Sequence, residues 1–234
     1  MGERFYDREA IPEHNRIEPD PIPPDELKEL VEKRKWYQTI DFGDGVATPG
    51  LFKSGEHIEK ILPDDMKGLR YLDIGSNQGH QVMAAAMRGA EACGIDKMKN
   101  QVEIARRLAS HFGIRADFAL MNLFDVPRKY EQFHAGFDFI TMMSVFHHFR
   151  RPILALKIVR AMCKGRFFGE FCCWVEGEKR WRRADEFPSD WGADYHKAYP
   201  TVECCVNGLK RFFSSVEVRD PVKAKHRIAI YAEI

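Results

Sequence analysis

The chain has 234 residues, of which 44% are hydrophobic and 30% are charged, and its formal net charge is +1 at pH 7. This is the composition of an ordinary folded domain, and the length suits one large α/β domain with an appendage. The near-neutral charge gives no overall electrostatic case for binding nucleic acid or a membrane surface, and no apolar run approaches the roughly 20 residues of a membrane span.

The N-terminal sequence has no apolar signal-peptide segment, and none of the six cysteines forms a Cys-x-x-Cys pair. Most of the cysteines fall in apolar segments, so we expect buried free thiols in a reducing cytosol. The pairs Cys172/Cys173 and Cys204/Cys205 leave open a thiol-bound metal or arsenic, although we expect no metal site. These features predict a cytoplasmic protein.

Residues 1–24 are polar and rich in proline, and we expect an extended arm with little structure of its own. Asp25 is placed to cap a helix over 26–35, in which apolar residues recur at helical spacing. That helix could form a lid over a cofactor or could simply pack on the sheet. Residues 36–41 alternate like a strand, and turns that contain glycine follow within 42–50.

A short apolar strand over 70–74 runs into a turn that contains Gly75 and Gly79, and a helix over 80–88 follows. This is the first strand–turn–helix of a nucleotide-binding α/β sheet, in which glycines allow a ligand to approach the main chain at the helix N-terminus. A second strand ends near Asp96, about 20 residues further on, where an acidic residue meets ribose hydroxyl groups in such folds.

The rest of the chain continues the alternation of helices and strands that a parallel sheet requires. The strand at 137–143 is almost wholly apolar, as expected for a parallel strand that is covered on both faces. An insertion at 176–200 interrupts the pattern, and the last two strands read as an edge hairpin. We expect helices at 56–62 (capped by Ser54), at 100–112, at 152–162 and from the cap Thr201 to Phe213, and strands at 91–95, 116–121, 166–175, 216–218 and 228–232.

The sequence Asp73-Ile-Gly-Ser-Asn-Gln-Gly79, followed by Gly94-Ile-Asp96, resembles the class I S-adenosylmethionine-dependent methyltransferases. The resemblance implies a Rossmann-like fold with a mostly parallel seven-stranded sheet, helices on both faces and an antiparallel C-terminal hairpin. It also implies S-adenosyl-L-methionine as the cofactor. Asn122 stands where relatives usually carry an acidic residue near the adenine, and an amide can still hydrogen-bond a base. The expected cofactor-binding residues are Asp73, Gly75, Ser76, Asn77, Gly79, Asp96, Lys97, Asn122, Leu123 and Ser144.

A finer resemblance concerns residues 36–51, which are similar to a segment found in relatives of the carboxymethyl transferases that modify wobble uridine in tRNA. There the segment ends in an Ile-Asp pair that helps to wall the active site, and Ile40-Asp41 occupies that place here. The resemblance as a whole covers about residues 36–175. The long N-terminal region of the tRNA enzymes is missing, which weighs against carboxymethyl transfer and against tRNA as the substrate.

Methyl transfer from a sulfonium depends on alignment more than on acid–base help, because the leaving group is neutral. A base is needed only to deprotonate the acceptor. His147 and His148 follow the strand at 137–143, where relatives commonly hold an aromatic-His pair and where open α/β sheets bind ligands. One of them could act as the base, or both could only pack. Asp41 is the second catalytic candidate.

The insertion at 176–200 lies where this family often builds its acceptor pocket. Its aromatic rings could stack on a planar molecule and its arginines could hold an anion, although a surface hairpin with its own aromatic cluster is the alternative. We expect the insertion and residues 36–41 to close a pocket over the methyl group. The expected substrate-binding residues are Trp36, Trp174, Arg180, Trp181 and Tyr195.

Together these observations predict an S-adenosylmethionine-dependent methyltransferase that modifies an oxygen or nitrogen atom of a small-molecule acceptor. Two alternatives stay open, a tRNA-modifying methyl or carboxymethyl transferase and a non-catalytic module that binds S-adenosylmethionine. We expect an N-terminal arm and lid at 1–53 and the cofactor-binding domain at 54–234. We expect a small-molecule partner rather than nucleic acid and no membrane partner, and a homodimer stays open.

Overall fold

The structure is a computed structural model that describes residues 6–50, 52–53, 58–129, 133, 135–174, 176, 182–190, 192, 198–219 and 227–234. Its contacts divide the chain into two compact units, each of which is described by itself. Unit 1 comprises Met1–Leu69 and Ser76–Leu120, and unit 2 comprises Arg70–Gly75 and Met121–Ile234. The predicted division into an arm and lid at 1–53 and a cofactor-binding domain at 54–234 is based on function rather than on contacts. It stays a prediction.

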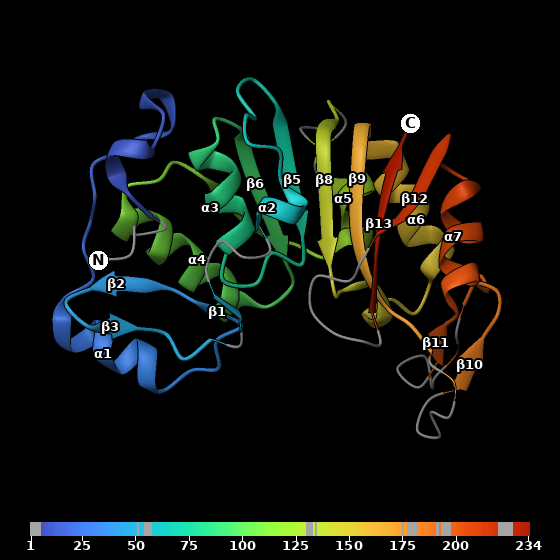
Figure 1. Cartoon of the computed structure of the whole chain (residues 1–234), viewed down its shortest axis with the longest axis horizontal. Coiled ribbons are helices and arrows are strands. Elements are labelled where there is room, and N and C mark those ends of the chain that lie inside the picture. Colours follow the sequence, from blue (N-terminus) through green and yellow to red (C-terminus); the bar gives the residue numbers. More distant parts are fainter. Residues whose placement is uncertain are drawn as a thin grey trace. The chain divides into compact units, whose positions relative to one another are not determined.

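Seven strands form the main sheet, in the order β12-β13-β9-β8-β5-β6-β7 (Figure 1). Strand β8 pairs in parallel with β5 and β9, and β6 pairs in parallel with β7, whereas β13 runs antiparallel to both β9 and β12. This topology confirms the predicted Rossmann-like fold with an antiparallel C-terminal hairpin. The strands are β5 Arg70–Ile74, β6 Glu91–Asp96, β7 Asp117–Leu120, β8 Phe137–Met143, β9 Cys163–Cys172, β12 Ser215–Arg219 and β13 Arg227–Glu233.

In unit 1, helices α3 (His80–Met87) and α4 (Lys99–Phe112) pack on β6 and β7. Helix α4 forms because its buried residues recur at helical spacing, and it ends at Gly113, whose left-handed φ of 68° terminates the helix. The other elements of this unit are the short 3-10 helices η1 Arg8–Ala10 and η2 Glu13–Asn15, the helices α1 Pro24–Glu32 and α2 Ile58–Ile61, and the strands β1 Gln38–Thr39, β2 Asp41–Gly43, β3 Val46–Ala47 and β4 Phe52–Lys53.

In unit 2, strand β8 is buried along its length except at the half-buried Asp138, as its apolar sequence predicted. Helix α6 (Pro152–Met162) begins with proline, and α7 (Val202–Lys210) is capped by Thr201, whose hydroxyl accepts from the Cys204 N–H at 3.1 Å. Both helices pack beside the strands of the C-terminal half of the sheet. The remaining elements are η3 Leu123–Asp125, α5 Val126–Lys129, η5 Phe146–His148, β10 Arg182–Ala184 and β11 Ala198–Pro200.

We expected residues 1–24 to form an extended arm with little structure of its own, but its described part, from residue 6 on, has a fixed course. The arm forms η1 and η2, and Ile11 is only 1% exposed. The side-chain NH2 of Asn15 donates to the carbonyl oxygens of Ala86 and Ala90, each at 2.8 Å, so it bridges the end of α3 and the start of β6. These long-range bonds give the arm a fixed course that its polar composition did not reveal.

Several element boundaries also differ from those expected by one to three residues, and two of the starts have a clear cause. Helix α1 begins at Pro24 rather than after an Asp25 cap, because proline favours the first helical position, where no N–H partner is needed. Strand β9 begins at Cys163 rather than at 166, since α6 ends directly before it and Cys163 already pairs with Phe137 of β8.

All six cysteines are free, and five of them are buried, as expected. The sulfur atoms of Cys173 and Cys205 lie 3.8 Å apart. Across the part of the chain that the structure describes, there is no group of three or more His, Cys, Asp or Glu side chains that could hold a metal ion. Within the same residues, every helix is too short or too polar to cross a membrane.

The Asn15 bridge predicts that Asn15→Ala lowers the free energy of unfolding by about 1–3 kcal/mol, because a buried two-fold donor is removed. Urea unfolding measures this change. The matched control is Glu13→Ala in the same turn, where the side chain is exposed and the change should stay within about 0.5 kcal/mol. Equal effects of the two substitutions would show that the arm does not depend on Asn15.

Candidate functional site

In unit 1, residues 76–79 form the turn that leads into α3. The Ser76 N–H donates to the Ile95 oxygen at 3.0 Å, which fixes the turn to the end of β6. Asn77 adopts a left-handed φ of 50°, which is uncommon for a residue other than glycine. Ser76 Oγ and Asn77 Oδ1 are buried and have no hydrogen-bond partner within the described chain. Such atoms mark a place where a bound ligand can complete the hydrogen bonding.

Asp96, at the end of β6, joins this turn to the segment before α4. Its Oδ2 accepts from the Asn77 N–H at 3.0 Å, and its Oδ1 accepts from the Met98 N–H at 2.8 Å. Each carboxylate oxygen can accept a further hydrogen bond, so the half-exposed Asp96 can also receive ligand hydroxyl groups. Lys97, beside it, is exposed.

The two glycines of the motif have positive φ angles, 76° at Gly75 and 80° at Gly79, as a tight turn requires. We expected them to make room for a ligand, but the protein itself fills that space. A Cβ atom at Gly79 would lie 2.6 Å from Cε1 of Phe118, and one at Gly75 would collide with Cγ2 of Val145. The glycines are therefore required by internal packing within each unit.

In unit 2, Asp73 is 3% exposed and belongs to a chain of buried hydroxyl groups. Its Oδ1 accepts from the Thr141 hydroxyl at 2.8 Å, and the Thr141 Oγ1 lies 2.5 Å from the Tyr71 hydroxyl. Burial and the neighbouring Asp73 carboxylate raise the pKa of Tyr71 well above its ordinary value, so this phenol stays protonated. The chain fixes the orientation of Asp73.

Two further predicted cofactor contacts lie at η3. Asn122 is exposed, and its side-chain oxygen accepts from the Phe124 N–H at 3.1 Å, which caps η3. Leu123 is 3% exposed. Asn122 thus has a local capping role that an aspartate could also perform.

Ser144 belongs to a buried polar cluster that we did not foresee. It has a left-handed φ of 58°, its N–H donates to the Glu170 main-chain oxygen at 3.0 Å, and its hydroxyl donates to Glu170 Oε1 at 2.7 Å. Arg227 Nη1 donates to the same Oε1 at 3.1 Å and also to the Ser144 hydroxyl oxygen. One signal was available in the sequence, since Glu170 is an ionisable residue within the apolar stretch 167–173.

His147 and His148 lie side by side in unit 2, with ring centroids 4.0 Å apart. The His147 ring stacks at 6.1 Å on Tyr199, and its Nδ1 is buried without a partner in the described residues. Burial, then the charges of His148 and Arg227, lower the pKa of His147 to about 3. A histidine with so low a pKa is a weak general base at neutral pH, whereas His148 is exposed.

The two candidates in the N-terminal segment of unit 1 have local structural roles. Asp41 is exposed, and its Oδ1 accepts from the Gly43 N–H at 2.8 Å, which shapes the β2–β3 hairpin. Trp36 is 2% exposed, and its ring N–H donates to the Val31 oxygen at 3.1 Å. A ring buried in this way offers no open face to a substrate, so Trp36 does not enter the function proposed below.

The insertion is only partly described. Trp174 is half-buried, and the guanidinium carbon of Arg183 lies 5.1 Å from the centre of its ring, within the range of a cation–π contact. Strands β10 and β11 pair in parallel. The other predicted substrate-binding residues, Arg180, Trp181 and Tyr195, lie outside the described residues.

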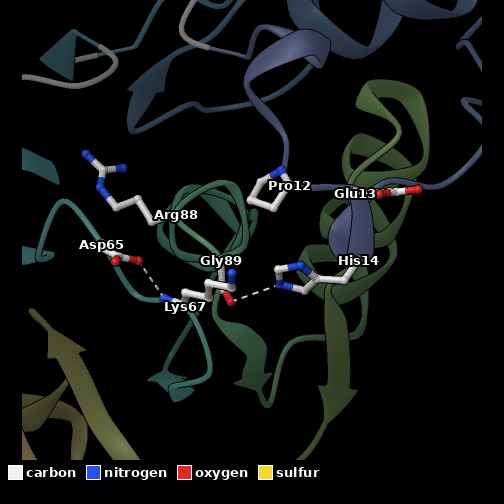
Figure 2. A pocket seen from close by; sticks show the side chains of 7 residues that line it. All are labelled: Pro12, Glu13, His14, Asp65, Lys67, Arg88 and Gly89. Carbon is white, nitrogen blue, oxygen red and sulfur yellow. Dashed lines mark hydrogen bonds between the residues drawn. The ribbon is translucent and has the colours of Figure 1, made fainter.

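A surface cleft of about 370 Å³ in unit 1 is a separate feature (Figure 2). His14 hydrogen-bonds the Gly89 oxygen at 3.1 Å there, while the side chains of Glu13 and Arg88 point away from each other. Arg88 and Gly89 come directly before β6, at its amino end. Ligands of open α/β sheets bind beyond the carboxyl ends of the strands, so this cleft is not the cofactor site. The cleft is lined by Pro12, Glu13, His14, Asp65, Lys67, Arg88 and Gly89.

A parallel sheet that closes with an antiparallel hairpin, a glycine turn after β5 and an acidic residue at the end of β6 define the class I methyltransferase fold. A model of the methyltransferase domain family matches residues 65–216, which is more than half of the chain. The chain therefore belongs to this family.

Two curated relatives are ubiquinone biosynthesis O-methyltransferases. The protein from Actinobacillus pleuropneumoniae serotype 5b (strain L20) is 31% identical over 98 residues, which cover 42% of this chain and 42% of the relative. The protein from Roseobacter denitrificans is 31% identical over 102 residues, which cover 44% of this chain and 40% of the relative. The chain thus spans less than half the length of these curated relatives.

Solved structures share the fold. The N-terminal domain of EvdMO1, crystallised in the presence of SAH and D-fucose, superposes with a TM-score of 0.62 at 13% identity, covering 91% of this chain and 97% of that one. Magnesium protoporphyrin IX methyltransferase from Synechocystis PCC 6803 with bound SAH gives a TM-score of 0.52 at 13% identity, covering 71% and 74%. At such identities the likeness shows the fold alone.

The contact between Gly75 and Val145 can be tested with a double-mutant cycle. Gly75→Ala should lower the free energy of unfolding by about 2–4 kcal/mol, because it combines an unfavourable φ with overpacking. Gly75→Ala combined with Val145→Ala should cost less than the sum of the single changes. Gly68→Ala is the control, since Gly68 has a φ of 75° but nothing within 4 Å of the added atom, and it should cost only about 1–2 kcal/mol. Strict additivity would contradict the proposed contact.

The low pKa of His147 predicts a pH dependence of stability. In the native state His147 takes up a proton only near pH 3, whereas an unfolded histidine titrates near pH 6.5. Between these values the unfolded chain binds the extra proton, so the free energy of unfolding rises with pH. The stability that neutral His147 contributes is therefore complete above about pH 6.5 and is lost as the pH falls towards 3.

Urea unfolding at several pH values between 4 and 7.5 measures this slope. His147→Gln should flatten it, because the substituted residue does not titrate. His148→Gln is the matched control and should keep the greater part of the slope, since burial of His147 is the largest cause of its low pKa. The same slope in wild type and in His147→Gln would refute the assignment.

Proposed function

We propose that this chain is an S-adenosylmethionine-dependent methyltransferase that modifies an oxygen or nitrogen atom of a small molecule, with oxygen as the favoured atom. The observation that carries the proposal is the turn at 76–79, where buried Ser76 Oγ and Asn77 Oδ1 lack partners beside the Asp96 carboxylate. Membership of the methyltransferase domain family supports it. The curated relatives named above favour O-methylation of a small acceptor.

The residues of unit 1 fit the cofactor's adenosine portion. Asp96 would accept hydrogen bonds from the ribose hydroxyl groups, while Ser76 and Asn77 would complete their own hydrogen bonding against the ligand. The assignments of Asp73, Asn122 and Leu123 in unit 2 to the cofactor stay predictions. When bound, S-adenosylmethionine supplies a methyl group that is bonded to a positively charged sulfur. The sulfur is the leaving group and becomes a neutral thioether.

The acceptor oxygen would bond to the methyl carbon as the carbon–sulfur bond breaks, and the hydroxyl proton must then leave. We assign this proton to water through the exposed His148 rather than to His147, whose pKa of about 3 makes it a weak base. His147 would instead form part of the wall, stacked on Tyr199. Trp174, with Arg183 over its ring, would offer an aromatic surface to the acceptor.

We also propose that residues 1–53 act as a cap for the cofactor turn. Two contacts within unit 1 support this. The Tyr6 hydroxyl hydrogen-bonds Nδ1 of His80, and the Gln78 side chain donates to the Lys35 oxygen at 3.0 Å. Gln78 and His80 flank Gly79, so both segments of the N-terminal region are attached to the turn itself.

The finer similarity of residues 36–51 to relatives of the tRNA carboxymethyl transferases stays a prediction. Three arginines that could contact a phosphate backbone already have carboxylate partners. Arg150 lies 2.7 Å from Asp190, Arg151 lies 3.6 Å from the same carboxylate, and Arg183 lies 2.8 Å from Asp185. Each would lose that partner on binding RNA, so we favour the small-molecule acceptor.

Calorimetry with S-adenosylhomocysteine tests the cofactor assignment. The wild-type chain should bind it, and Asp96→Ala should weaken binding by about 1.5–3 kcal/mol, the range for a hydrogen bond to a charged group. Asp117→Ala, which removes the same charge from an exposed position at the start of β7, is the matched control and should bind normally. A folded wild-type chain that does not bind S-adenosylhomocysteine would overturn the proposal.

Methyl transfer is tested with labelled S-adenosylmethionine and three compact acceptors, which are catechol, phenol and aniline. Labelled product from a hydroxyl-bearing acceptor supports O-methylation, and product from aniline alone would assign nitrogen. Normal cofactor binding without transfer to any of the three would favour the non-catalytic module.

A further inference from the structure

Glu170 in β9 is fully buried, with a relative exposure of 0%, yet only one of its two carboxylate oxygens is bonded. Oε1 accepts from the Ser144 hydroxyl at 2.7 Å and from Arg227 Nη1 at 3.1 Å. Oε2 has no partner within the described residues. Arginine–carboxylate pairs frequently form two parallel hydrogen bonds, one to each oxygen. Here Arg227 directs Nη1 at the oxygen that is already bonded.

The cluster lies at the edge of the sheet where ligands bind. Glu170 is paired in register with Met143, the last residue of β8, and Ser144 follows directly. This is the carboxyl end of two neighbouring parallel strands. The unpartnered Nδ1 of His147 lies three residues beyond Ser144, and the charge of Arg227 acts on that ring. Two buried polar atoms without partners among the described residues therefore belong to β9 and to the segment that follows β8.

The chemistry of Oε2 restricts what can complete it. An ionised carboxylate oxygen only accepts hydrogen bonds, so its partner must be a hydroxyl or an N–H group. A carbonyl, ether or carboxylate oxygen placed there would repel Oε2, because neither atom carries a hydrogen to share. Leaving a buried charged oxygen unpartnered is costly, and such exceptions concentrate at functional sites.

Strand order favours the acceptor as the source of this donor group. In the sheet, β9 and β13 lie on the side of β8 away from β5, whereas the glycine motif follows β5. The ammonium group of the cofactor is the alternative source of the donor.

We propose that Glu170 is a specificity-determining residue whose Oε2 accepts a hydrogen bond from a second hydroxyl or amine group of the acceptor, beside the atom that is methylated. This inference rests on the proposed function. It implies an acceptor with two neighbouring donor groups. Ser144 and Arg227 are positioning residues, because they hold Oε1 and so direct Oε2.

The test compares catechol, which has two adjacent hydroxyl groups, with phenol, which has one. Wild type should show a kcat/KM at least about 10-fold higher for catechol, because a site built to bind a hydroxyl discriminates against an analogue that lacks it. In Glu170→Gln, an amide nitrogen replaces the accepting oxygen. That variant should lose about 10-fold or more of kcat/KM for catechol and less than about 2-fold for phenol, while its affinity for S-adenosylhomocysteine stays within about 2-fold.

Asp138→Asn is the matched control. It makes the same chemical change in the same sheet, but Asp138 lies at the amino end of β8, where it accepts from the Arg70 N–H at 2.8 Å. It should leave the catechol-to-phenol ratio unchanged. If Glu170 had only a structural role, Glu170→Gln would lower kcat/KM for catechol and for phenol equally. That result would overturn the inference.

Two further outcomes would also overturn it. Weaker binding of S-adenosylhomocysteine to Glu170→Gln would assign the donor group to the cofactor. Equal kcat/KM values of wild type for catechol and phenol would show that the site recognises no second donor group of the acceptor. This measurement tests the inference even if Glu170→Gln does not fold. Failure of the proposed function is recognised separately, because the wild-type chain would then bind no S-adenosylhomocysteine or transfer no methyl group.

Discussion

The attachment of the turn at 76–79 to the end of β6 is the constraint on which unit 1 depends. The Ser76 N–H bonds the main chain of β6, and the Asp96 carboxylate bonds the main chain of the turn and of the segment before α4. Three pieces of backbone thus meet at one acidic side chain. The residue that we propose to hold the ribose is also the residue that shapes its own site, so ligand binding and local structure share the same hydrogen-bond acceptor.

In unit 2, two buried carboxylates obtain their hydrogen-bond partners in different ways. Asp73 and Glu170 are both buried carboxylates, but their surroundings differ. Asp73 is served by a neutral hydroxyl chain, whereas Glu170 faces a charged guanidinium and leaves one oxygen without a partner. The same positive charge helps to keep His147 neutral.

The sequence predicts the sheet, the main helices and the cofactor motif because these depend on periodicity and turn chemistry. Strand β8 and helix α6 match the predicted residues at both ends. The polar composition of residues 1–24 could not reveal the fixed course of the arm, because a single side chain, the amide of Asn15, forms the bridging hydrogen bonds. The reason for Gly79 was also hidden, because Phe118 comes near it only in the folded chain. Glu170 and Arg227 lie far apart in sequence, and their pairing depends on the register of β9 with β13.

The bridge made by Asn15 has a consequence for the order in which unit 1 assembles during synthesis. The arm is translated before its partners, because Asn15 bonds the main chain at Ala86, Ala90 and Arg115. The arm must therefore stay undocked until most of unit 1 has been translated. Loop closure over so long a separation is slow compared with the formation of a helix such as α4. The Asn15 amide thus gains its two acceptors only after Ala90 has been made, so docking of the arm follows the synthesis of α3 and cannot guide it.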